Sequence, residues 1–216
     1  MTSDANSSVS LILVPSSSII KDIQSIRATG LDSVAYYYFD FKDNRKQDCR
    51  GLLSSILHQL CTQTHRGYSI LSSLYKAHDN GSQQPSEVDL TQCLKDVLAL
   101  PRHGRVYIIV DAVDESPNKP GIPSPREKVL QFMKELVDLR HPDMRLCITS
   151  RPEVDVRTVL EPLASHAVSL HTEGGQTNDI ISYIKSVVES DANMRKWRSE
   201  DRQLVIDSLS QKASGM

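Results

Sequence analysis

Residues 106–115 read VYIIVDAVDE, five apolar residues that run without interruption into an aspartate. A short, continuous apolar run rich in β-branched side chains is typical of a strand covered on both faces. Helix-like segments with apolar residues at three- and four-residue spacing separate this run from others of the same kind. The alternation predicts an α/β fold with a mainly parallel sheet. The strands are expected at Val34–Phe41, Val106–Val110, Arg145–Thr149 and Ala167–Leu170.

Start signals mark two of the expected helices. Ser86 is placed as an N-cap ahead of an apolar stripe that ends near Pro101. Residues 124–127, SPRE, combine a capping serine, a proline at the first helical position and a capping-box glutamate. The remaining helices are expected at Ser17–Ala28, Cys49–Gln63, Gly67–His78, Gln176–Ser190 and Ser199–Lys212.

Composition excludes several classes of protein. Hydrophobic residues make up 39% and charged residues 24% of the 216 residues, which is enough for a packed domain. The net charge of −2 offers no basic excess for nucleic acid or an anionic membrane, and the apolar runs are too short to span a bilayer. The four cysteines are scattered without a CxxC pair, as reduced core thiols are. We therefore expect a cytoplasmic protein with neither nucleic-acid nor membrane partners.

Asp111 follows its strand directly, and Asp114 and Glu115 follow shortly after. An apolar strand that ends in an acid is the Walker B pattern, because a magnesium ion on nucleotide phosphates needs a rigidly held carboxylate. A second acid nearby can orient or deprotonate the attacking water. The alternative interpretation is that Asp111 is only a turn or cap residue after a buried strand.

Arg151 follows the next expected strand in the segment Ser150-Arg151-Pro152. An arginine there could sense or neutralise a γ-phosphate. The alternative is a surface arginine ahead of a proline that starts a helix. Because the carboxyl ends of parallel strands meet at one edge, we expect Asp111 and Arg151 to lie close together, with Asp114 or Glu115 facing the same crevice.

The segments YIIVDAVDES, LCITSRPEVDV and SVAYYYFDFKDNRKQD…LLSSILHQL resemble the NACHT domains of fungal proteins. More narrowly, they resemble the nephrocystin-3-like N-terminal group of the STAND class of signalling ATPases and GTPases. The resemblance implies a P-loop NTPase-like three-layer sandwich that uses Mg²⁺ with ATP or GTP. It implies Asp111 as the magnesium-associated acid, Asp114 or Glu115 as the catalytic acid near the water, and Arg151 as a catalytic sensor arginine.

The chain departs from that family at the phosphate-binding loop. Members carry a GxxxxGK[ST] loop between the first strand and helix, which wraps the phosphates with backbone N–H groups and a lysine. Here Leu11–Ser16 stands at that place, and no Gly-Lys dipeptide occurs in the sequence. The run Val9–Val14 could fill the slot of the first strand. We expect a sheet truncated at the first strand, and no nucleotide bound by this chain.

The resemblance divides the chain into three parts. Residues 1–15 do not match, 16–172 form the NACHT-like core, and 173–216 begin a helical region. Both ends look cut, as in a fragment or a decayed copy. One hypothesis is an interaction scaffold that has lost nucleotide binding and has protein partners, through self-association or through effector and sensor domains. Another is a functional ATP- or GTP-binding switch, and a third is an unrelated doubly wound domain.

Overall fold

The computed structural model describes residues 8–12, 32–101, 104–119, 123–168 and 174–213. The chain divides into two compact units, Met1–Val168 and Ser169–Met216. The boundary expected after residue 172 lies outside the described residues, as do the helix expected at Ser17–Ala28 and most of Leu11–Ser16.

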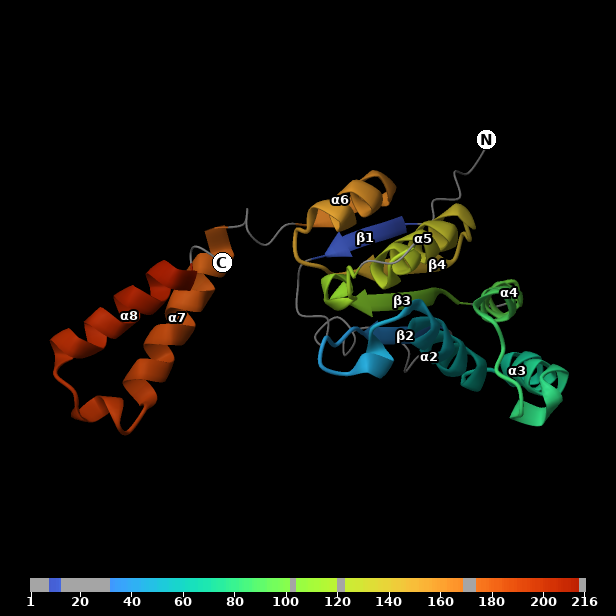
Figure 1. The fold of residues 1–216 in the computed structure, drawn as a ribbon. Helices are drawn as coiled ribbons and strands as arrows, with labels where there is room; N and C mark the ends of the chain where they lie inside the picture. The colour runs from blue at the N-terminus through green and yellow to red at the C-terminus, as the bar shows by residue number, and fades with distance from the viewer. Residues whose placement is uncertain (1–7, 13–31, 102–103, 120–122, 169–173, 214–216) are drawn as a thin grey trace. The chain divides into compact units, whose positions relative to one another are not determined.

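Five parallel strands form the sheet of the first unit, in the order β2-β3-β4-β1-β5. Figure 1 shows β2, β3, β4 and β1 side by side in that order. All four expected strands are present, and β3 has a neighbour on both sides as predicted. The fifth, β1, lies between β4 and β5, in the slot that the run Val9–Val14 could fill. The expectation of a sheet truncated at the first strand is therefore wrong, because this short apolar run pairs with both neighbours. The strands are β1 (Ser8–Ile12), β2 (Ser33–Tyr38), β3 (Val106–Asp111), β4 (Met144–Ile148) and β5 (His166–Val168).

The second strand ends earlier than the apolar run suggested. The run was expected to continue to Phe41, but that side chain is 62% exposed and β2 ends at Tyr38. The chain turns because Asp43 donates its N–H to the carbonyl of Asp40 at 3.1 Å and then caps a short 3₁₀ helix, η1 (Asn44–Lys46). Phe41 therefore extends the aromatic pattern of the sequence, although it lies in the turn after the strand.

Two helices of the first unit begin where the start signals predicted. Ser86 and Ser124 each complete a capping box with the residue three positions on. A seven-residue helix, α6, was implied only by the alternative interpretation of Arg151, because so short a segment shows little periodicity. The helices are α2 (Cys49–Thr62), α3 (His65–Ala77), α4 (Glu87–Leu98), α5 (Pro125–Asp138) and α6 (Val154–Leu160), with 3₁₀ turns η2 (Asp79–Gly81), η3 (Val113–Glu115) and η4 (Glu161–Leu163).

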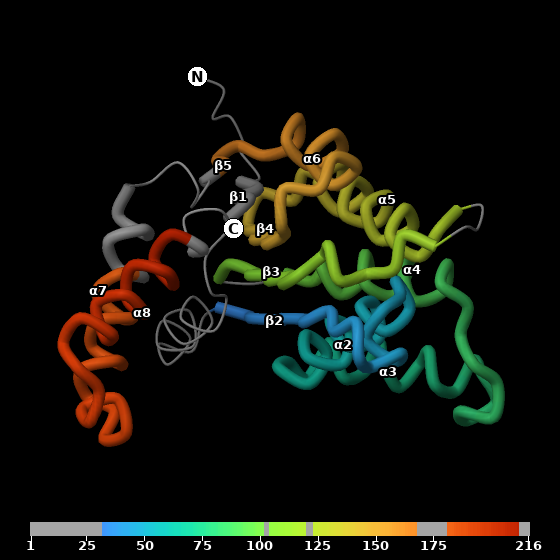
Figure 2. The backbone as a smooth tube through the Cα atoms, turned by 60° about the vertical axis from the view of Figure 1, so that its left-hand side comes forward, coloured from blue at the N-terminus to red at the C-terminus, as the bar shows by residue number. Residues whose placement is uncertain are grey.

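Alternate residues of each strand lie on opposite faces of the sheet, and both faces carry apolar side chains. Ala35, Ile108 and Leu146, which pair across the sheet, belong to the main core with α2, α4, α5 and α6. Val34 and Ile109 lie on the opposite face, beside partly buried tyrosines. Both faces of the sheet are therefore apolar, which confirms the reading of continuous runs as strands of an α/β fold. Figure 2 shows α2 beside β2, and α3 packs on α2.

The second unit is a pair of helices, α7 (Gly174–Ser190) and α8 (Ser199–Ala213), joined through a 3₁₀ turn, η6 (Met194–Lys196). Val188 of α7 and Ile206 of α8 are buried. Both helices were predicted to within a few residues.

Among the described residues, no helix is both long enough and apolar enough to cross a membrane.

Candidate functional site

The expected site residues follow the ends of neighbouring strands. Val110 of β3 pairs with Ile148 of β4, so Asp111 and Thr149 come next at the same level. Arg151 follows two residues later, at the same carboxyl edge. In the strand order, the connection after β1 leads to β2 on one side, whereas the connection after β4 leads to β5 on the other side of β1. Open α/β sheets bind ligands at such a switch point, between β1 and β4. Asp111 lies at the end of β3, one strand away from that point.

Thr149 holds the carboxylate of Asp111. The Thr149 hydroxyl donates to Asp111 Oδ1 and accepts the N–H of Ala112 at 3.0 Å. The backbone continues the β3–β4 pairing past the strand ends, with Thr149 N–H on the Val110 carbonyl at 2.9 Å and Val113 N–H on the Thr149 carbonyl at 3.1 Å. Thr149 is 6% exposed, so this arrangement is shielded from water. Asp111 is therefore fixed at the strand end, as a metal-associated carboxylate must be.

The Asp114 carboxylate binds both the backbone and the side chain of Arg151. Its Oδ1 accepts the backbone N–H of Arg151 at 3.0 Å, and its Oδ2 lies 3.5 Å from the guanidinium Nε of the same residue. The Asp114 side chain is 8% exposed, whereas that of Arg151 is 78% exposed. The carboxylate thus anchors the loop after β4 and pairs with the cation expected to meet a phosphate. The exposure of Arg151 agrees with the alternative interpretation of a surface arginine.

Glu115 also has a partner within the chain. Its Oε2 accepts the N–H of Phe41 at 3.2 Å, which ties the segment after β3 to the segment after β2. Next to it, the hydroxyl of the fully buried Ser116 donates to the carbonyl of Gln47 at 2.9 Å. Glu115 and Ser116 therefore join two loops at the carboxyl edge.

A cavity of about 390 Å³ lies among these loops. Asp114, Glu115 and Arg151 line it, so three of the four expected site residues share one hollow. Asp111 is not part of the lining, which corrects the expectation of a single crevice. The reason is local: Ala112 adopts a left-handed conformation with φ 58°, and the chain turns away after Asp111. The other lining residues are Phe41, Asn44, Gln47, Ser116, Pro117, Lys119, Arg126 and Glu153.

Arg126 organises this cavity, and sequence reasoning missed it. Its guanidinium donates to the carbonyl of Ser116 at 2.9 Å and to that of Asp114, and pairs with Asp155 of α6 at 3.3 Å. The side chain is only 11% exposed. In the sequence, Arg126 reads as an ordinary first-turn residue of α5. Thr149 was likewise interpreted only as the last residue of its strand. Its position one residue after the expected strand core, matching that of Asp111 on the neighbouring strand, could have predicted their contact.

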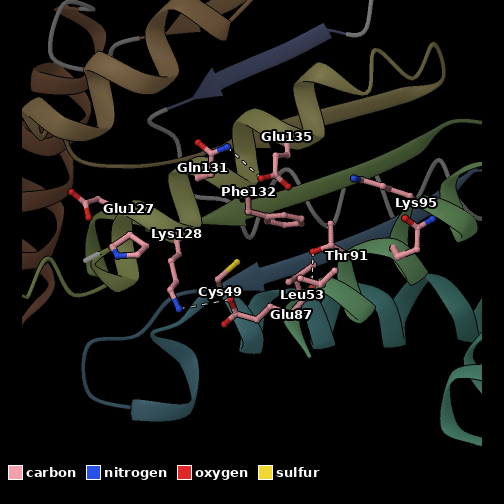
Figure 3. Close-up of a pocket in the computed structure, with 13 residues that line it drawn as sticks. Cys49, Leu53, Glu87, Thr91, Lys95, Glu127, Lys128, Gln131, Phe132 and Glu135 are labelled. Carbon is pink, nitrogen blue, oxygen red and sulfur yellow. Dashed lines mark hydrogen bonds and ion pairs between the residues drawn. The ribbon is translucent and has the colours of Figure 1, made fainter. Parts of the chain in front are cut away.

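Another cavity, of about 550 Å³, lies between α4 and α5 and contains none of the expected residues (Figure 3). Lys128 and Glu87 reach toward each other across it at 3.8 Å, and the Cys49 thiol and the Phe132 ring point into it. Burial raises the pKa of Cys49 to about 12, so its thiol stays protonated at neutral pH. The Cys49 thiol is therefore not an activated nucleophile.

All four cysteines are free thiols, as expected. Burial, and to a lesser degree the Asp111 carboxylate, raises the pKa of the Cys147 thiol to about 11. No cluster of three or more His, Cys, Asp or Glu residues within the described ranges could hold a metal ion.

A magnesium nucleotide fits these residues only in part. Magnesium commonly takes one or two carboxylates and completes its shell with water and phosphate oxygens, a role that the fixed Asp111 suits. The phosphates need N–H donors and a lysine from a glycine-rich loop, and the sequence has no Gly-Lys pair. The residues therefore do not make a complete nucleotide site. The metal, water-activating and sensor roles of Asp111, Asp114, Glu115 and Arg151 stay predictions.

The sequence model of a family described as nephrocystin 3, N-terminal, matches residues 13–151, more than half of the chain. No curated protein sequence matches. Among solved structures, the Aeropyrum pernix ORC2 protein, solved as ADPNP–ADP complexes, is similar at 14% identity and a TM-score of 0.49, over 85% of this chain and 46% of that one. Drosophila ORC bound to DNA is similar at 10% identity and a TM-score of 0.37, over 72% of each chain. The chain thus spans less than half of the ORC2 chain, and at these scores neither likeness bears on its function.

Proposed function

The chain belongs to the nephrocystin 3 N-terminal family and has a P-loop NTPase-like fold, and from that premise we propose that it is a decayed copy or fragment of a NACHT-type signalling NTPase. It keeps the magnesium side of the nucleotide site and lacks the phosphate side. As it stands, it binds magnesium nucleotide very weakly or not at all. It acts as a protein-interaction scaffold.

The pairing of Arg151 with Asp114 is the observation that supports this proposal most strongly. A triphosphate carries several negative charges and needs cations or N–H donors around it. At this edge it would meet the carboxylates of Asp111, Asp114 and Glu115, and the one expected cation already faces Asp114. The carboxylates would therefore repel a nucleotide that has no phosphate loop to hold it.

The missing loop sets the size of the loss. Hydrogen bonds to charged groups contribute roughly 1.5–3 kcal/mol each. The loss of three such contacts costs about 4 kcal/mol or more after discounting, which is a factor on the order of a thousand in affinity. A family member that binds at micromolar Kd would thereby be weakened to about millimolar.

One observation favours the alternative, a functional ATP- or GTP-binding switch whose phosphate loop is absent only from this sequence. Thr149 still holds Asp111 at the strand end, in a shielded arrangement that a purely structural sheet does not require. A retained magnesium side would regain function if the loop were supplied.

A loop graft separates the two candidates. A GxxxxGKS loop is inserted between Val14 and Ser17, and ATP and GTP are titrated with magnesium into the grafted and unmodified chains by calorimetry. The matched control carries the same graft with its lysine replaced by alanine. Binding by the lysine graft alone supports a retained magnesium side. Micromolar binding by the unmodified chain refutes the proposal, and no binding by any chain refutes the retained magnesium side.

A further inference from the structure

The outer edge of β2 is covered by side chains in place of another strand. β2 stands at the end of the strand order. The N–H groups of Ser33 and Phe39 donate to carbonyls beside and at the end of β3, at 2.8 and 3.1 Å. Because successive strand residues point their backbone groups to opposite edges, the N–H and C=O groups of Val34 and Tyr36 face away from β3. These are the groups through which a further strand would join the sheet.

Two glutamines of α2 occupy those groups. The Val34 N–H donates to Gln63 Oε1 at 3.0 Å, and Gln63 Nε2 donates to the Val34 carbonyl at 2.6 Å. The Tyr36 N–H donates to Gln59 Oε1 at 3.1 Å, and Gln59 Nε2 donates to the Tyr36 carbonyl at 2.7 Å. Each side-chain amide thus exchanges two hydrogen bonds with one strand residue. Directly opposite residues of an antiparallel pair do the same.

The match follows from the repeats of helix and strand. Gln59 and Gln63 are four residues apart, a rise of about 6.0 Å along a helix. Val34 and Tyr36 are two residues apart, about 6.6 Å along a strand. Ser55, one turn before Gln59, accepts a further hydrogen bond from Gln59 Nε2 at 3.0 Å and helps to fix its amide. The glutamines therefore follow the strand in register, as a short antiparallel strand would.

The strand itself explains the need for a cover. Ser33–Tyr38 reads SVAYYY, with no charge, proline or glycine. Uncharged, β-prone edge strands are templates for pairing with another chain, and folded proteins normally block them with charge, proline or a covering element. β2 carries no blocking charge of its own, so the two glutamines are its block.

We propose that the outer edge of β2 is a self-association surface that Gln59 and Gln63 hold closed, and that its partner is β2 of a second copy of this chain. Two copies related by a two-fold axis present the same edge to each other, and their strands run antiparallel. The glutamine bonds already reproduce that antiparallel pattern. Displacement of the two amides would free Val34 and Tyr36 to make the same bonds with a second strand. This surface does not depend on nucleotide binding.

Hydrogen exchange of single backbone amides tests the proposal. In Gln59→Ala the amide of Tyr36 should exchange on the order of tenfold faster, and in Gln63→Ala that of Val34 should do so, each without the other. In the double variant both amides should exchange fast when the protein is at micromolar concentration. At sub-millimolar protein concentration both amides should become protected, and sedimentation should show a dimer at the same concentration. The original chain should show neither change.

The control is a double variant with the same substitution at exposed glutamines of other helices, Gln92→Ala and Gln131→Ala, which make only local side-chain bonds. It should behave as the original chain. Unchanged exchange at Val34 and Tyr36 in the single variants would show that the glutamines do not close the edge. A double variant that stays monomeric, or that associates while both amides still exchange fast, would refute β2 as the self-association surface. If the double variant does not fold, hydrogen exchange in the two single variants still tests whether each glutamine protects its strand amide.

Discussion

Replacement of Arg126 by methionine should destabilise the first unit strongly, because the guanidinium holds three separate segments. It donates to the carbonyls of Ser116 and Asp114 and pairs with Asp155 at 3.3 Å, with its side chain only 11% exposed. A methionine fills much of the same space but leaves these acceptors without their donor. Unsatisfied buried groups cost about 1–3 kcal/mol each, and water can reach part of this site. We expect a loss of about 3 kcal/mol.

Urea unfolding followed by circular dichroism measures that loss. With an m-value of about 2 kcal/mol per molar urea, the midpoint should fall by about 1.5 M at constant m. Arg126→Lys should recover only part of it, because an ammonium cannot reproduce the planar fork.

Arg157→Met is the matched control, since Arg157 of α6 makes an exposed pair with Glu161 at 2.6 Å. It should cost no more than about 0.5 kcal/mol. A loss below about 1 kcal/mol for Arg126→Met, or equal losses for the two variants, would refute the assignment of Arg126 as the organiser of this cavity.

Thr149→Val should lower the free energy of unfolding by about 2 kcal/mol, seen as a lower melting temperature, because it removes the hydroxyl that donates a hydrogen bond to the Asp111 carboxylate. The Ser86 hydrogen bonds lower the pKa of Asp89 in the folded chain, so Asp89 contributes stability above its ordinary pKa that is lost as the pH falls through the lowered one. Asp89→Asn should therefore weaken the acid dependence of unfolding in a pH series. The Cys147 thiol, with its pKa raised to about 11, should resist alkylation at pH 8 in the folded chain and react on unfolding, as read by mass spectrometry.

The strands were predictable because their signal is local. Val106–Val110 is continuous, β-branched and buried, and a strand covered on both faces leaves that signature in any context. The caps at Ser86 and Ser124 are equally local, since each bond joins residues three positions apart. The end of β2 was missed because the turn at Asp43 overrides the aromatic pattern. The helix α6 was implied only by the helix-starting proline after Arg151, because its seven residues show little periodicity.

The site was predictable in position but not in detail. Asp111 and Arg151 share an edge because β3 and β4 are parallel neighbours, which spacing alone indicates. The bond from Asp114 to the Arg151 backbone joins residues 37 positions apart, so no local pattern reveals it. Gln59 and Gln63 look in the sequence like the solvated side of an amphipathic helix. Their contact with β2 appears only once the helix lies beside the strand.

The central claim, that this chain does not hold a magnesium nucleotide, is tested most directly by thermal unfolding of the unmodified protein. A ligand that binds only the folded state stabilises it by about 2.7 kcal/mol at a hundred times its Kd. With 1 mM nucleotide and magnesium, a Kd near 10 µM would therefore raise the melting temperature by several degrees. We expect the same melting temperature with and without ATP or GTP. A reproducible, magnesium-dependent rise of several degrees would contradict it.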